Sequence, residues 1–205
     1  HNRWYTGGGI YRPVNLFVAD KRHIDLYGLK ITTLSIHPAR IRVDVHHTGG
    51  EKIHVAIFDG GQLIAEVSGQ APFEINVPDA KLWSAEMPHL YQARAELIAQ
   101  GSVVDTAEET FGIRTVTVQP EKGLLVNDVP TFLRGGCIHN DNGVIGVINN
   151  DVTELRRARN IKRAGFNAIR SAHHPMSRSL MKACDEVGLY VMDEAFDSWY
   201  RPKVM

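Results

Sequence analysis

Three short apolar runs of the sequence end in side chains that could bind a polar ligand or move protons. They are "GGCIHND" at residues 135–141, "RSAHHP" at residues 170–175 and "MDEAFDSW" at residues 192–199. Histidine, arginine and carboxylate groups supply the hydrogen bonds, charges and acid–base chemistry that enzyme sites use. One polar end would carry little weight, because strands of any fold often end in polar residues. Three in succession predict a site, provided that the fold brings them together.

The segments between these runs indicate how they are brought together. "DVTELRRARNIKRAG" (151–165) predicts a helix, with Asp151 as its N-cap, Glu154 three residues later and Gly165 at its end. "SRSLMKACDEVG" (177–188) predicts a second helix. The three apolar runs are then strands of a β-α-β-α-β unit, in which a parallel sheet is covered by helices. Ligands of such sheets bind at the carboxyl ends of the strands, where all three polar ends would meet.

From about residue 20 to residue 118 the apolar residues follow a period of two instead. "RIRVDVHH" (40–47) and "KIHVAIFD" (52–59) both alternate, and "DGGQ" (59–62) has the composition of a tight turn. About six or seven such strands predict an antiparallel sandwich of immunoglobulin-like type. His46 and His47 are neighbours on one strand, so their side chains should point to opposite faces and not form a metal pair.

Composition excludes several classes of protein. Among the 205 residues, 23 Lys and Arg balance 23 Asp and Glu, so nothing predicts binding to nucleic acid or an anionic membrane. No apolar stretch approaches the ~18 residues of a membrane-spanning helix. Cys137 and Cys184 are too few for a disulfide framework, and both are predicted to be free, buried thiols.

The sequence resembles glycoside hydrolase family 2, the family of β-galactosidases and β-glucuronidases. The resemblance covers nearly all of the chain, in the family's order. It is carried by "NRWYTGGGIYRPVNL" (2–16), "KLWSAEMPHLY" (81–91), "FGIRTV" (111–116), "FLRGGCIHNDNGVIG" (132–146), "AGFNAIRSAHHP" (164–175) and "DEVGLYVMDEAFDSW" (185–199). It implies three parts: the end of a jelly-roll sugar-binding domain at 1–17, an immunoglobulin-like sandwich at 18–118, and the truncated start of a (β/α)8 TIM barrel at 119–205.

The resemblance also implies roles for individual residues. His139 and His173 should contact sugar hydroxyls, and Arg170 should support the catalytic nucleophile. Asp193 and Glu194 match the family's "DE" at the end of the third strand and are predicted to bind the substrate.

Two further residues are candidates for sugar binding. Asp197 and Trp199 follow the same strand, and Trp199 is either a stacking platform for a sugar or ordinary core. Some β-galactosidases bind magnesium through a glutamate where this chain has Ser198. A magnesium requirement is therefore doubtful, and no cofactor is expected.

The catalytic carboxyl pair itself is not expected in this chain. A retaining glycosidase needs two carboxyl groups about 5–5.5 Å apart, whereas Asp193 and Glu194 are consecutive, so their side chains should diverge. The resemblance implies an acid/base glutamate in an Asn-Glu pair after a fourth strand, and a nucleophile later still. We therefore expect a fragment that is inactive by itself. Its parent would cleave terminal β-linked sugars, with β-galactosides as the first choice and β-glucuronides or β-mannosides as alternatives.

Two other classes of function remain as alternatives. "IHND" could place His139 and Asp141 as ligands in a metal-dependent amidohydrolase-like barrel, for which zinc dependence would be the test. The chain could also be a non-catalytic carbohydrate-binding scaffold. The expected partner is a carbohydrate, and a homo-oligomer stays open. The sequence does not decide between a cytoplasmic and a periplasmic or secreted location.

Several of these residues also have a purely structural interpretation. His139 could be a structural histidine at a strand end, and Arg170 could be an ion-pair partner inside the barrel. His174 is expected to pack or to support its neighbours more than to bind a ligand. Trp83 and Met87 are expected to pack inside the sandwich.

Overall fold

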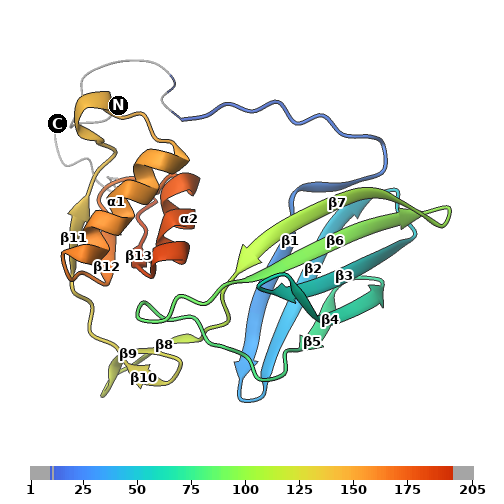
Figure 1. Ribbon diagram of the computed structural model, residues 1–205, viewed down its shortest axis with the longest axis horizontal. Coiled ribbons are helices and arrows are strands. Elements are labelled where there is room, and N and C mark those ends of the chain that lie inside the picture. Colours follow the sequence, from blue (N-terminus) through green and yellow to red (C-terminus); the bar gives the residue numbers. More distant parts are fainter. Residues whose placement is uncertain (1–9, 11, 196–205) are drawn as a thin grey trace. The chain divides into compact units, whose positions relative to one another are not determined.

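The computed structural model describes residue 10 and residues 12–195, which form two compact units (Figure 1). One unit comprises Leu16–Thr131, and the other comprises the remaining described residues. Among the described residues, neither helix is long and apolar enough to cross a membrane.

The first unit contains two antiparallel sheets that face each other. One sheet has the order β1-β2-β5 and the other the order β4-β3-β6-β7. The strands are β1 (His23–Ile36), β2 (Ala39–Thr48), β3 (Lys52–Asp59), β4 (Gln62–Gly69), β5 (Phe73–Asn76), β6 (Tyr91–Ala99) and β7 (Ser102–Phe111). In the β3–β4 hairpin Asp59 pairs with Gln62, and the two turn residues, Gly60 and Gly61, both have positive φ. Only glycine takes up this turn conformation at both positions without steric cost.

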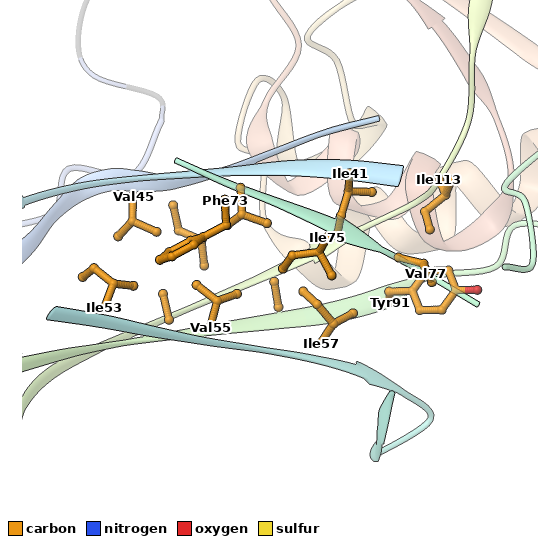
Figure 2. Packing of buried hydrophobic residues seen from close by; sticks show 14 of the residues in the cluster. Ile41, Val45, Ile53, Val55, Ile57, Phe73, Ile75, Val77, Tyr91 and Ile113 are labelled. Atoms are coloured by element: carbon orange, nitrogen blue, oxygen red, sulfur yellow. The ribbon is translucent and has the colours of Figure 1, made fainter. Parts of the chain in front are cut away.

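The period-two alternation of the sequence becomes the core of this sandwich. Ile41 on β2 and Ile53 and Ile57 on β3 are fully buried, whereas Arg42 is exposed. Figure 2 shows the side chains of β2 and β5 pointing toward those of β3. The predicted sandwich is therefore confirmed, with one layer of apolar side chains between two sheets.

The loop before β6 confirms one packing prediction and corrects another. Trp83 is buried, as expected. Met87 is 70% exposed, so the prediction that it packs inside the sandwich was wrong. The backbone amide of Ser84 donates to the carbonyl of Met87, and the amide of Met87 donates to the Ser84 hydroxyl. This tight turn directs the Met87 side chain to solvent.

A small third sheet follows the sandwich and was not expected. It has the order β10-β9-β8 and consists of β8 (Val116–Gln119), β9 (Gly123–Val126) and β10 (Val129–Pro130). Asn127 and Asp128 turn the chain between β9 and β10, both with positive φ. Asn127 also accepts a hydrogen bond from the amide of Thr115 and donates one to the carbonyl of Trp83. These bonds attach the small sheet to the sandwich.

The second unit contains the predicted β-α-β-α-β alternation. Its strands form a parallel sheet of order β11-β12-β13. The elements are β11 (Gly135–Ile138), the 3-10 turn η1 (Gly143–Ile145), α1 (Asp151–Arg163), β12 (Ala168–Ser171), α2 (Arg178–Val187) and β13 (Tyr190–Met192). The core between sheet and helices contains Ala158, Ile169, Leu180 and Leu189.

The observed N-cap of α1 differs from the predicted one. The N-cap is Asn150 and not Asp151: its side chain accepts a hydrogen bond from the amide of Thr153, and the Thr153 hydroxyl accepts one from the amide of Asn150. Asp151 is the first helical residue, where a carboxylate is favoured by the helix dipole. Helix α1 ends at Arg163, two residues before Gly165.

The two cysteines are both free but differ in burial. Cys184 on α2 is buried, and burial raises the pKa of its thiol to about 12. Cys137 is exposed, so the prediction that it is buried was wrong. Strand β11 pairs with β12 alone among the described residues, which leaves the Cys137 side chain accessible beside Arg170.

Candidate functional site

The register of the parallel sheet places the three polar strand ends side by side. Ile138 pairs with Ser171, and Arg170 pairs with Met192. His139 therefore follows β11 at the same edge where His173 follows β12 and Glu194 follows β13. The sequence predicted this clustering, because parallel strands share one carboxyl edge.

Three imidazole rings lie together at this edge. The rings of His139 and His173 are stacked, with centroids 5.8 Å apart and planes inclined by 26°. The ring of His174 lies edge-on to His139 at 6.4 Å. His139 and His173 thus form one polar surface that hydroxyl groups of a ligand could approach.

Glu194 connects β12 and its loop to β13. Its Oε1 accepts from Nε of Arg170 at 2.6 Å, and its Oε2 accepts from the backbone amide of His173 at 2.5 Å. The hydrogen bond from the His173 amide holds the pKa of Glu194 below its ordinary value. The hydrogen bond and the positive charge of Arg170 lower the pKa of Glu194 further. Hydrogen bonds to the Cys137 sulfur and then to Glu194 raise the pKa of Arg170. Both groups are therefore charged at neutral pH, and Arg170 is an ion-pair partner whatever else it does.

His173 has an unusual backbone conformation at this contact. Its φ is 76°, in the left-handed region that non-glycine residues rarely adopt. The Glu194 carboxylate binds the amide of this residue, so the contact holds the strained turn in place. Such strain is concentrated at functional sites in proteins.

Asp193 binds a different part of the same loop. Its Oδ1 accepts from the amide of Met176 at 2.8 Å. The carboxylates of Asp193 and Glu194 thus bind different residues, in agreement with the expectation that they diverge. Contact of either carboxylate with a sugar stays a prediction.

His174 is engaged by the backbone, as expected for a supporting residue. Its Nε2 accepts from the amide of Asn140 at 2.9 Å, so this nitrogen carries no proton. Burial, and to a lesser degree the charge of Arg12, lowers the pKa of His174. Arg12 itself donates to the carbonyl of Pro175. Sequence reasoning did not assign Arg12 to the site, because nothing in "YRPVNL" indicates its contact with a loop so distant along the chain.

Two residues of α1 also lie at this edge, and the sequence analysis did not assign them to the site. Arg157 donates to the carbonyl of His139, and the fully buried Glu154 lies beside the Arg157 guanidinium. Glu154 was predicted to be part of the helix cap. Its spacing of four from the buried Ala158 is the signal that places it on the inward face of the helix.

The remaining predicted residues lie outside the described part of the chain. They are Asp197 and Trp199, predicted to bind sugar, and Ser198, on which the argument about magnesium rests. Their predicted roles stay predictions. Within residue 10 and residues 12–195, no group of three or more His, Cys, Asp or Glu side chains is placed to bind a metal ion.

The sequence matches two family models that follow one another along the chain. One, described as glycosyl hydrolases family 2, matches residues 24–114. The other, described as the TIM barrel domain of that family, matches residues 116–198. The chain therefore belongs to glycosyl hydrolases family 2. The predicted family and fold class, an immunoglobulin-like sandwich followed by the first β-α units of a TIM barrel, are confirmed.

Individual relatives have two different activities in their names. A putative β-glucuronidase of Formosa agariphila is 33% identical over an alignment of 210 positions that covers 97% of this chain and 20% of that protein. A β-galactosidase of Bacteroides ovatus is 31% identical over an alignment of 222 positions that covers 99% of this chain and 26% of that protein. A crystal structure of a family member from Bacteroides cellulosilyticus has a TM-score of 0.88 at 32% identity and covers 98% of this chain and 28% of that one. The chain spans about a quarter of the length of these relatives.

Proposed function

We propose that this chain is part of a retaining glycoside hydrolase that cleaves terminal β-linked sugars. The observation that supports it most is the convergence of His139, His173, Arg170 and Glu194 at one edge of a parallel sheet in a family 2 chain. A β-galactoside is the first choice of substrate. A β-glucuronide is the second, because relatives with either name match nearly the whole chain.

In this proposal the two histidines bind the sugar and the charged pair keeps the loop in place. The ring nitrogens of His139 and His173 hydrogen-bond to hydroxyl groups of the terminal sugar. Arg170, held by Glu194, presents a positive charge beside the catalytic nucleophile, which a later part of the barrel would supply. Glu194 already binds His173 and Arg170 through both oxygens, so it is a poor candidate for that nucleophile.

The same proposal assigns the parts of the chain. Residues 1–17 are the end of a jelly-roll domain, 18–118 the sandwich and 119–205 the start of the barrel. The acid/base and nucleophile carboxyls must stand about 5–5.5 Å apart across the bond that is cleaved. Asp193 and Glu194 bind different backbone amides and do not form this pair, so the 205-residue chain should hydrolyse no glycoside by itself.

The test uses the full-length enzyme and its His173→Ala variant with nitrophenyl β-galactoside and β-glucuronide. The wild type should hydrolyse one of the two, and the variant should lose about 10²-fold in kcat/KM, since hydrogen bonds to the sugar strengthen in the transition state. Arg40→Ala is a matched control, because Arg40 forms an exposed ion pair with Glu74 on the sandwich. Full activity in a folded His173→Ala variant, or a wild type inactive on both substrates, would contradict the proposal.

A further inference from the structure

The peptide between His139 and Asn140 is bound through both of its polar groups. Its carbonyl accepts from Nη2 of Arg157 at 2.8 Å, and its N–H donates to Nε2 of His174 at 2.9 Å. Arg157 belongs to α1 and His174 to the loop after β12, so two separate elements hold this one peptide. Asn140 is 3% exposed. Movement of the peptide would therefore break both hydrogen bonds in a place that water reaches poorly.

Arg157 is itself fixed by two carboxylates. Its Nη2 also donates to Oδ1 of Asp141 at 3.0 Å, and its Nη1 lies 3.9 Å from Oε2 of Glu154. Glu154 is fully buried, and its other oxygen accepts from Nδ2 of Asn142 at 2.9 Å. Asp141, from the loop that carries His139, thus binds the guanidinium directly, and Asn142 of the same loop binds Glu154, the second carboxylate beside it.

His174 can hold the peptide only while its Nε2 is unprotonated. An imidazolium ion has two donors and no acceptor, so it would repel the amide of Asn140. Among the described residues, Arg12, His139 and the hydroxyl of Ser171 face this ring. The positive charge of Arg12 and the burial of the ring both favour the neutral form.

We propose that Arg157 and His174 are positioning residues that fix the His139–Asn140 peptide, and through it the ring of His139, against His173. The inference rests on the proposed function, because it assumes that His139 binds the sugar. Neither side chain needs to touch the substrate. Each acts on the backbone immediately after His139, so a small displacement there moves the ring relative to its partner at 5.8 Å.

The experiment compares matched variants of the full-length enzyme. His174→Phe keeps the ring shape but removes the acceptor, whereas His174→Gln restores an acceptor near the place of Nε2. Arg157→Lys keeps the positive charge, but a lysine has one nitrogen where Arg157 uses Nη2 for His139 and Asp141 and Nη1 for Glu154. Arg159→Lys is the control on the same helix, because Arg159 pairs with Glu186 at the surface. Each variant is also made in a His139→Ala background.

We expect His174→Phe and Arg157→Lys to lower kcat/KM about tenfold, as for the loss of a buried hydrogen bond. His174→Gln and Arg159→Lys should stay within about twofold of the wild type. In the His139→Ala background the first two effects should disappear, because the residue through which they act is gone. Thermal unfolding of each variant shows whether it is folded. If His174→Phe does not fold, the comparison of Arg157→Lys in the wild-type and His139→Ala backgrounds decides.

Two results would overturn the inference while leaving the proposed function intact. One is wild-type kcat/KM in folded Arg157→Lys and His174→Phe. The other is a loss that persists undiminished without the His139 ring, which is the result expected from a purely structural role. A wild-type enzyme that hydrolyses neither substrate would instead overturn the proposed function, and this inference with it.

Discussion

Asn167 joins the start of β12 to the segment that leads into β11. Its side chain accepts from the amide of Arg134 at 2.7 Å and donates to the carbonyl of Phe132 at 3.0 Å. Asn167 is 4% exposed, so water cannot readily replace these two contacts around its side chain. Asn167→Ala removes both bonds at the point where the register of β11 and β12 begins. The variant therefore tests how the sheet that carries His139 and His173 is held together.

The expected loss of stability follows from these two hydrogen bonds. Each hydrogen bond contributes about 1 kcal/mol net, so their loss should lower the local stability by about 2 kcal/mol. Phe132 and Arg134 are exposed, so water can replace the lost partners and the cost should not rise far above this value. At about 1.4 kcal/mol per factor of ten, amide exchange in β12 should accelerate about 30-fold.

Native-state hydrogen exchange on the 205-residue chain measures this directly. The amides of Ile169 and Arg170 report on β12, and the amide of Val55 in β3 is the internal reference. Asn160→Ala is the matched control, because Asn160 lies on the exposed side of α1 and should change stability by less than about 0.5 kcal/mol. Unchanged exchange in β12, or equal acceleration of Val55, would refute the argument that Asn167 stabilises the sheet locally.

Three further predictions concern stability and reactivity. Burial lowers the pKa of His174 when the chain is folded, so the unfolded chain binds more protons in acid. Stability should therefore fall as the pH drops below about 6.5, and His174→Gln should flatten this slope in a plot of Tm against pH; an unaltered slope would contradict the assignment. A thiol titration at about pH 8 should detect one reactive cysteine in the native chain, Cys137, and a second after denaturation, since the pKa of Cys184 is about 12. Immediate reaction of both thiols in the native chain would show that Cys184 is accessible. Ile57→Ala should destabilise the sandwich by about 2–5 kcal/mol in urea unfolding, and Met87→Ala by less than about 0.5 kcal/mol; equal effects would disprove the burial pattern.

The features that the sequence predicted depend on local periodicity or on topology. Alternation at Ile41 and Ile53 predicts strands because side chains of a strand point to opposite faces. The meeting of His139, His173 and Glu194 follows from parallel topology, which places successive strand ends on one edge. Neither inference requires knowledge of distant contacts.

The features that the sequence did not predict depend on tertiary contacts or on the detailed geometry of a helix cap. Arg157 reaches a carbonyl at the end of β11, and no spacing along α1 shows this. Asn150 and Asp151 are both good N-caps, and the capping box formed with Thr153 decides between them. Cys137 lies in an apolar run, yet its strand has a neighbour on one side only within the described residues, so composition overstated its burial.

The most direct test of the proposed sugar-binding edge is a crystal structure of the full-length enzyme with its sugar product bound. Ring nitrogens of His139 and His173 should lie within about 3 Å of sugar hydroxyls in that complex. Glu194 should keep its bonds to Arg170 and to the amide of His173 in that complex. A sugar bound at the barrel without contact to either histidine would contradict the assignment of this strand edge as the sugar-binding site.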